Sequence, residues 1–169
     1  WHDFNLNKKK YIVITLHRPS NVDEEIYLKG FIDEIINNSK DFTLVFPVHP
    51  RTKKKLNNLN LNNPRLKMTP PLSYLEFNFL VKNSFAVITD SGGITEETTV
   101  MGIPCLTIRN NTERPETVEV GTNELVGTNP KNLKKYMDKL FSGKWKKGSI
   151  PNFWDGKSSK RIIDVLVNL

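Results

Sequence analysis

Polar side chains follow four apolar runs of this sequence, at the point where each run ends. They are His17 and Arg18, His49 and Arg51, Asp90 and Ser91, and the segment 109–114. In an open parallel sheet, ligands bind outside the carboxyl ends of the strands, where helix N-termini point inward. If the four runs are parallel strands, two of the three histidines lie on one rim of the domain. Taken singly, each histidine also fits a structural role at a strand end.

Two adjacent glycines, Gly92 and Gly93, follow Ser91 where a helix is expected to begin. Residues without a Cβ let the backbone approach a diphosphate closely, and the free amides of the first helical turn point at the anion. Glu97 is within reach of the diol of a ribose on the same diphosphate, and its carboxylate accepts from both hydroxyls. A tight turn also needs glycine for purely steric reasons. The segment predicts a nucleoside diphosphate site.

Arg114 lies in the segment 112–116, which opens another expected helix with Pro115 in its first turn. A planar guanidinium with five donors suits a fixed cation that faces a diphosphate or a sugar. The segment equally fits a capped helix start with a solvated charge pair.

Strands and helices are expected to alternate along the chain. The strand-like runs are 10–16, 42–48, 65–68, 85–89, 104–108 and 124–127, and the helical patterns are 23–38, 51–59, 72–81, a helix opening at the two glycines, 130–141 and 156–169. Such alternation indicates right-handed strand-helix-strand units around a mostly parallel sheet. We therefore predict an α/β fold of the doubly wound, Rossmann-like type.

Three expectations concern which side chains are buried and which are exposed. In the helix 72–81, the residues expected to be buried are Leu72, Leu75, Phe79 and Leu80. The segment 142–153 contains two Gly, a Pro and three Lys, and is expected to be an exposed connection. The final helix carries an apolar stripe at Ile162, Val165, Leu166 and Leu169.

Composition limits the class of protein. A chain of 169 residues with 37% hydrophobic and 25% charged residues fits one globular domain. No apolar run is long enough for a membrane span, and no secretory signal opens the sequence. The single cysteine, Cys105, excludes an internal disulfide and is expected in the core, which favours an intracellular location. The three histidines and this cysteine have no metal-ligand spacing, so no metal site is predicted.

The formal charge of +7 suits an anionic ligand or a nucleic acid. The lysines lie mainly in the local clusters 8–10, 53–55 and 144–147, interleaved with Asn, without a periodic stripe of arginine and aromatic residues. We interpret them as solvated surface and predict no nucleic-acid site.

Several segments together resemble the UDP-N-acetylglucosamine 2-epimerases, in the order in which that family has them. They are 15–21 (TLHRPSN), 47–50 (PVHP), 90–97 (DSGGITEE), Arg109 with 112–116 (TERPE), Gly121 with 125–127 (LVG), and 154–156 (WDG) with Arg161 and Ile162. The resemblance runs from Tyr11 to the C-terminus, and the DSGG and TERPE motifs make it specific. One departure is Ser20, where many members have Glu.

The resemblance implies two Rossmann-like domains of the glycosyltransferase-B type, with the nucleotide sugar between them. Residues 1–169 resemble the second domain, without the N-terminal half. The implied substrate contacts are Ser91, Gly92 and Gly93 to the diphosphate, Glu97 to the ribose, Arg114 to the phosphate side, and Leu72 and Phe77 to the uracil. His17 would be the catalytic residue facing the sugar, and Arg18, His49 and Glu113 would lie at the rim, where some members bind a regulatory nucleotide sugar.

The family interconverts UDP-N-acetylglucosamine and UDP-N-acetylmannosamine by eliminating UDP and adding it back, without a redox cofactor. This chemistry needs acids and bases near C2 of the sugar, which in the family come mostly from the N-terminal domain. The resemblance thus implies that this chain alone binds UDP or a UDP-N-acetylhexosamine without turnover, and that the complete enzyme is cytoplasmic and a candidate homodimer. A hydrolysing relative, a nucleotide sensor and a basic RNA-binding domain remain alternatives.

Overall fold

Six parallel strands form one sheet in the order β3-β2-β1-β4-β5-β6. The computed structural model describes residues 5–59 and 61–168. Its strands are β1 (Tyr11–Thr15), β2 (Thr43–Pro47), β3 (Leu66–Thr69), β4 (Ala86–Thr89), β5 (Cys105–Thr107) and β6 (Asn123–Leu125). The chain winds outward from β1 to β3 and then returns to place β4 beside β1, which makes the β1–β4 boundary the switch point of the sheet. A ligand crevice is expected at the carboxyl ends of these two strands.

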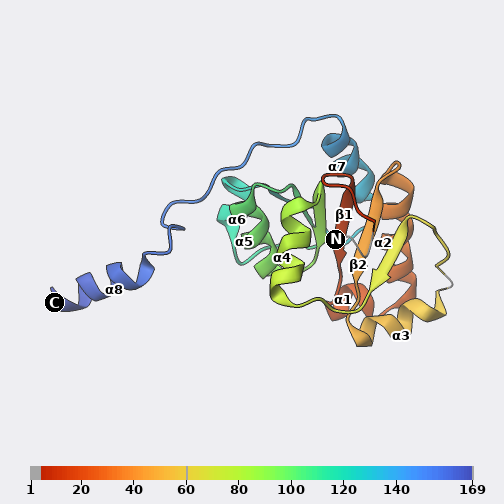
Figure 1. The fold of residues 1–169 in the computed structure, drawn as a ribbon, viewed down its shortest axis with the longest axis horizontal. Coiled ribbons are helices and arrows are strands. Elements are labelled where there is room, and N and C mark those ends of the chain that lie inside the picture. The colour runs from red at the N-terminus through yellow and green to blue at the C-terminus, as the bar shows by residue number, and fades with distance from the viewer. Residues whose placement is uncertain (1–4, 60, 169) are drawn as a thin grey trace.

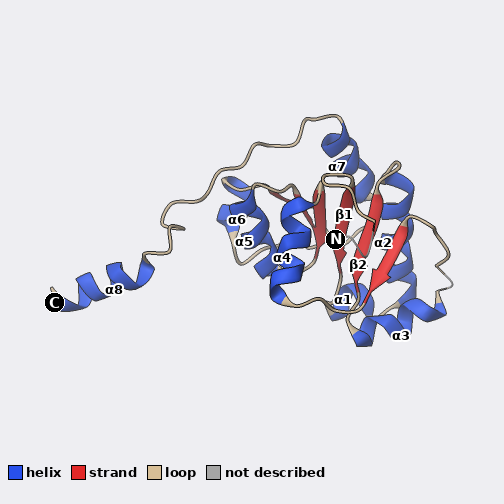
Figure 2. Ribbon diagram, viewed as in Figure 1, coloured by secondary structure: helices blue, strands red, loops and turns tan. Residues whose placement is uncertain are grey.

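Helices cover both faces of the sheet (Figures 1 and 2). They are α1 (Pro19–Val22), α2 (Glu25–Asn38), α3 (Pro50–Asn58), α4 (Tyr74–Asn83), α5 (Gly92–Met101), α6 (Pro115–Glu119), α7 (Asn132–Phe141) and α8 (Ser158–Val167). This confirms the predicted α/β, doubly wound, Rossmann-like fold. The expected helix 130–141 begins two residues later than predicted, after a turn in which the Asn129 side chain accepts from the Lys131 amide at 3.1 Å.

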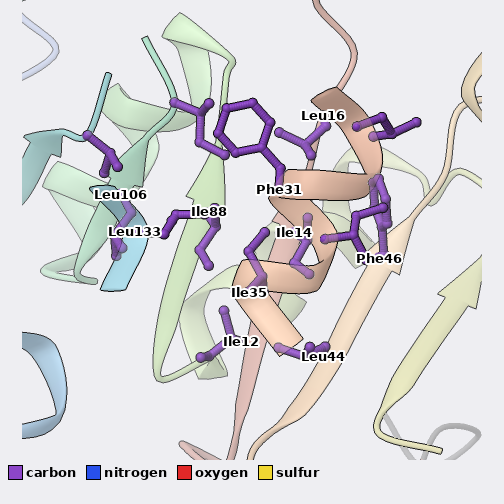
Figure 3. Packing of buried hydrophobic residues seen from close by; sticks show 14 of the residues in the cluster. Ile12, Ile14, Leu16, Phe31, Ile35, Leu44, Phe46, Ile88, Leu106 and Leu133 are labelled. Atoms are coloured by element: carbon purple, nitrogen blue, oxygen red, sulfur yellow. The ribbon is translucent and has the colours of Figure 1, made fainter. Parts of the chain in front are cut away.

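The strands alternate their side chains between two apolar clusters. On one face, Ile12, Ile14 and Phe46 pack with Phe31 and Ile35 of α2, as Figure 3 shows. A second cluster lies on the other face, where α4 contributes its last turn; its strand and α4 residues are Tyr11, Val13, Val45, Val87, Leu80 and Val81. Because both faces are covered, the strands appear in the sequence as continuous apolar runs.

Cys105 on β5 is fully buried, in agreement with the sequence prediction. Burial raises the pKa of its thiol to about 11, because the thiolate is poorly solvated there. At neutral pH Cys105 is therefore a small apolar core residue rather than a nucleophile.

The expected burial in α4 was partly wrong. Leu80 is buried, but Leu75 and Phe79 are 77% and 54% exposed. The helix begins at Tyr74 because Ser73 and Glu76 form a capping box that closes its N-terminus. The face turned towards the sheet carries Phe77, Leu80 and Val81, at steps of three and four, and Leu72 lies half-buried before the helix.

The connection 142–153 was expected to be exposed, and that was also partly wrong. Trp145 Nε1 donates to the Thr122 carbonyl at 2.9 Å, and the Ser149 amide donates to the Val120 carbonyl at 2.9 Å. Pro151 is buried. A Cβ on Gly148 would lie 2.5 Å from the Gly121 carbonyl carbon, so this close approach requires glycine. We call residues 145–151 the strap, since they tie the connection to the segment 120–122 that leads into β6.

Helix α8 follows the strap and projects away from the sheet (Figure 1). None of its described residues is buried. The predicted stripe residues Ile162, Val165 and Leu166 are between 59% and 64% exposed, and Leu169 lies outside the described residues. The apolar face of α8 is thus uncovered in this chain.

Candidate functional site

The buried Asp90 joins the carboxyl ends of β1 and β4. Its carboxylate accepts hydrogen bonds from the backbone amides of His17, at 3.1 and 3.2 Å to its two oxygens, and Arg18, at 2.9 Å. His17 Nδ1 lies 3.0 Å from Asp90 Oδ1, and the His17 side chain is 53% exposed while that of Asp90 is fully buried. The predicted catalytic histidine therefore stands on the rim of the switch point with its ring against a buried carboxylate.

Asn21 extends this arrangement to β5. Its side-chain amide, itself buried, donates to Asp90 Oδ2 at 3.1 Å and to the Ile108 carbonyl at 3.3 Å. Three strand ends are thus held by one carboxylate and one carboxamide. Sequence reasoning placed Asp90 on the rim but gave neither residue a role, although both stand within the motifs that carry the family resemblance.

The turn formed by Ser91, Gly92 and Gly93 opens α5 at the same crevice. Ser91 is the N-cap residue, and its amide donates to Thr89 Oγ1 at 3.0 Å. The first turn of α5 contains no acidic residue. A Cβ on Gly93 would meet nothing within 4 Å, so the space before this helix end is open. An uncompensated helix N-terminus of this kind favours an anion.

The ion pair of Arg109 and Glu113 lies against Gly92, where an added Cβ would be 3.6 Å from Glu113 Oε2 and 3.8 Å from Arg109 Nη1. The nearly buried Arg109 donates to both oxygens of Glu113, at 2.6 and 2.8 Å. This bidentate bond, helped by a backbone bond and by the charges of Arg109 and of Arg18 at 3.8 Å, lowers the pKa of Glu113 to about 2. Glu113 was predicted as a rim residue, and here it joins the loop after β5 to Arg18 at the end of β1.

Arg114 is fixed beside α5. Its Nε donates to Glu96 Oε1 at 2.6 Å, and its Nη1 donates to the Glu113 carbonyl at 3.1 Å. The hydrogen bond to Glu96 raises the pKa of Arg114, so the guanidinium stays charged. Arg114 is half-exposed and so keeps donors towards solvent. A charge pair of the kind expected for a capped helix start is therefore present. It joins Arg114 to Glu96 of α5 and so holds the guanidinium beside the helix that the glycines open.

Two pockets are lined in part by residues of α5. One, of about 280 Å³, is lined by Thr15, Leu16, His17, Pro47, His49, Pro71, Leu72, Phe77 and Ile94. The other, of about 300 Å³, is lined by Tyr74, Glu96, Glu97, Val100, Met101 and Trp154. The structure thus brings His17, His49, Leu72 and Phe77 together around one cavity and places Glu97 in the other.

Among the described residues, Glu97 differs from its neighbour Glu96 in having an unpaired carboxylate. It makes no side-chain hydrogen bond or ion pair with the part of the chain that the structure describes, whereas its neighbour Glu96 is occupied by Arg114. Glu97 lies one turn into the helix that the glycines open. It is therefore available to a ligand whose anionic part lies at the start of α5.

Within residues 5–59 and 61–168, no group of three or more His, Cys, Asp or Glu side chains is placed to hold a metal ion. Over the same residues, no helix has the length and apolar content needed to cross a membrane.

The chain is similar to known proteins over nearly its whole length. The sequence profile of a family described as UDP-N-acetylglucosamine 2-epimerase matches residues 2–167. A UDP-N-acetylglucosamine 2-epimerase of Methanocaldococcus jannaschii is 44% identical over 165 residues, which cover 92% of this chain and 44% of that protein. The chain therefore spans less than half the length of the curated relatives it matches.

Solved structures agree with the sequence comparison. The M. jannaschii UDP-GlcNAc 2-epimerase in complex with UDP-GlcNAc and UDP matches with a TM-score of 0.78 and 42% identity, covering 94% of this chain and 45% of that one. The UDP-GlcNAc 2-epimerase of Neisseria meningitidis bound to UDP-GlcNAc gives a TM-score of 0.81 at 34% identity, covering 95% and 45%. These TM-scores and sequence identities establish both the fold of the chain and its family.

Proposed function

Because the chain belongs to the UDP-N-acetylglucosamine 2-epimerase family, we propose that it is the UDP-binding half of an enzyme that interconverts UDP-N-acetylglucosamine and UDP-N-acetylmannosamine. The observation that carries this proposal is the glycine turn at the β1–β4 switch point, which opens a helix without acidic residues in its first turn. Two relatives of known structure are described with UDP-GlcNAc bound, one of them also with UDP.

The proposed binding mode follows the arrangement of the side chains. The diphosphate lies against Ser91, Gly92 and Gly93, where backbone amides compensate its charge. Arg114, held by Glu96, adds a fixed cation on the phosphate side. The open carboxylate of Glu97 accepts from the ribose hydroxyls.

The remaining roles concern the pocket that contains His17 and Phe77. Leu72 and Phe77 offer apolar surface to the uracil, and His17 faces the sugar from the same pocket. Arg18, His49 and Glu113 form the rim and are proposed to contact a regulatory nucleotide sugar where one binds.

The missing half of the active site is part of the same proposal. The uncovered apolar face of α8, together with a chain that spans less than half of its relatives, supports an N-terminal domain against which α8 packs. That domain would supply the acids and bases that act at C2 of the sugar. The isolated chain is therefore expected to bind UDP weakly and not to turn over. A homodimer and a cytoplasmic location of the complete protein complete the proposal, the latter supported by one free, buried cysteine.

Calorimetric titration of the chain with UDP tests the proposal. Glu97→Ala should weaken binding about tenfold or more, because a hydrogen bond to a charged group contributes about 1.5–3 kcal/mol, and Ser91→Trp should abolish binding by filling the turn. Glu119→Ala on the exposed side of α6 removes an equal charge away from the site and should change nothing. Salt-sensitive binding of a short RNA without binding of UDP would reject the proposal.

Product analysis of the full-length protein tests the reaction. The non-hydrolysing reaction should yield UDP-N-acetylmannosamine from UDP-N-acetylglucosamine, with neither free sugar nor net UDP. Accumulation of free N-acetylmannosamine with UDP would instead identify a hydrolysing enzyme.

A further inference from the structure

The contact between His17 and Asp90 bears on which ring nitrogen of the histidine carries the proton. A neutral imidazole carries its proton on one of two nitrogens, and the hydrogen bond made by one nitrogen decides which. Asp90 Oδ1 lies 3.0 Å from His17 Nδ1, and a carboxylate that already accepts from backbone amides can only accept there too. We propose that Asp90 is a positioning residue that holds the proton of neutral His17 on Nδ1 and presents Nε2 to the pocket as the working atom.

The carboxylate can do this because its own position does not depend on the histidine ring. The backbone amides of His17 and Arg18 and the side-chain amide of Asn21 all donate to it, at 2.9–3.2 Å. These donors come from the end of β1 and from α1, whereas Asp90 follows β4. Among the described residues, the His17 ring is the half-exposed side chain in contact with this buried and otherwise fixed carboxylate.

The opposite nitrogen of the ring is free to act. Nε2 has no hydrogen-bond partner within the part of the chain that the structure describes, and His17 lines the pocket that also contains Leu72 and Phe77. With the proton on Nδ1, Nε2 is a hydrogen-bond acceptor for a hydroxyl group in the pocket. When His17 is protonated, Nε2 becomes a donor, and Asp90 balances the added charge.

The identity of the hydroxyl rests on the proposed function, in which it belongs to the bound sugar. The orientation of the ring does not rest on it, because the contact between Nδ1 and Asp90 Oδ1 lies within this chain. A purely structural Asp90 would hold the strand ends together but leave the ring protons of His17 unaffected.

Nitrogen-15 spectra of the histidine rings test the inference directly. In the labelled chain, at a pH where His17 is neutral, its Nδ1 should show the shift of a protonated ring nitrogen and its Nε2 that of an unprotonated one. Signals are assigned with His17→Gln and His49→Gln. A neutral His17 with the proton on Nε2 would overturn the proposal.

Substitution of the carboxylate provides the second arm. Asp90→Asn should move the tautomer of His17 towards protonated Nε2, whereas Asp23→Asn, which removes an exposed carboxylate just after α1, should leave the ring signals unchanged. A folded Asp90→Asn chain with the wild-type tautomer would refute the assignment. If Asp90→Asn does not fold, the wild-type spectrum alone decides. No nucleotide is needed, so failure to bind UDP would reject the proposed function and leave this inference standing.

Discussion

The sheet and helix α8 use apolar residues in opposite ways. Residues of β1, β2 and β4 are buried on both faces by helices of the same chain. The apolar residues of α8 are 59–77% exposed. A helix of ten residues is marginal in water without tertiary packing. The sheet region is therefore covered by its own chain, whereas no described residue of this chain covers the apolar face of α8.

The strap is the boundary between these two regions. It is held by the Trp145 and Ser149 hydrogen bonds to the carbonyls of Thr122 and Val120. Beyond it, the Phe153 ring packs under the Arg161 guanidinium, whose Nη2 also pairs with Asp155. Local contacts therefore shape the start of α8, while its apolar face stays exposed.

The largest expected effect separates the two regions by stability. Phe46→Ala, at a fully buried position in β2, should lower the free energy of unfolding by about 3–5 kcal/mol, because it removes apolar burial and leaves a cavity. Leu166→Ala, at a position 64% exposed in α8, should change it by no more than about 0.5 kcal/mol. Urea denaturation followed by circular dichroism measures both. Similar losses would show that α8 is packed in solution.

An intermediate effect is expected at the strap. Gly148→Ala should cost about 1–3 kcal/mol, because the added Cβ meets the backbone of Gly121 and Thr122. Hydrogen exchange of the Ser149 amide should become faster as its bond to Val120 is lost. Ser149→Ala keeps that amide and its bond, and serves as the control. Unchanged exchange in Gly148→Ala would mean that the strap is not docked as described.

The sequence predicted the sheet well because its strands are buried on both faces. Such strands appear as uninterrupted apolar runs, and all six lay within their predicted ranges or at most one residue outside them. The buried face of helix α4 was harder to predict, because the helix carries apolar residues on both sides. Leu75 and Phe79 form one plausible stripe, and Phe77, Leu80 and Val81 form another. Only the position of the sheet decides between them.

The candidate site could also be predicted only in part from the sequence. The residue types at the strand ends were visible in the sequence, since His17, Asp90 and Ser91 each follow an apolar run. Their partners were not visible, because the pairs His17–Asp90 and Arg114–Glu96 join residues 73 and 18 positions apart. Such pairs depend on the strand order, which places β4 beside β1. The cover of α8 could not be predicted either, since a stripe shows which face is apolar but not what packs on it.

The smallest expected effect concerns the electrostatics of the rim. Glu113 has a pKa of about 2, below its ordinary 4.5, chiefly because Arg109 donates to it. Since the folded value is the lower one, the pair stabilises the fold fully above pH 4.5 and loses this contribution as pH falls towards 2. Carbon-13 titration of the Glu113 carboxyl should show the low value, and Arg109→Gln should move it back towards 4.5. Arg109→Lys keeps the charge but not the two-point hydrogen bond, so an intermediate value is expected. A wild-type Glu113 that titrates at 4.5 would show that the rim pair does not form in solution.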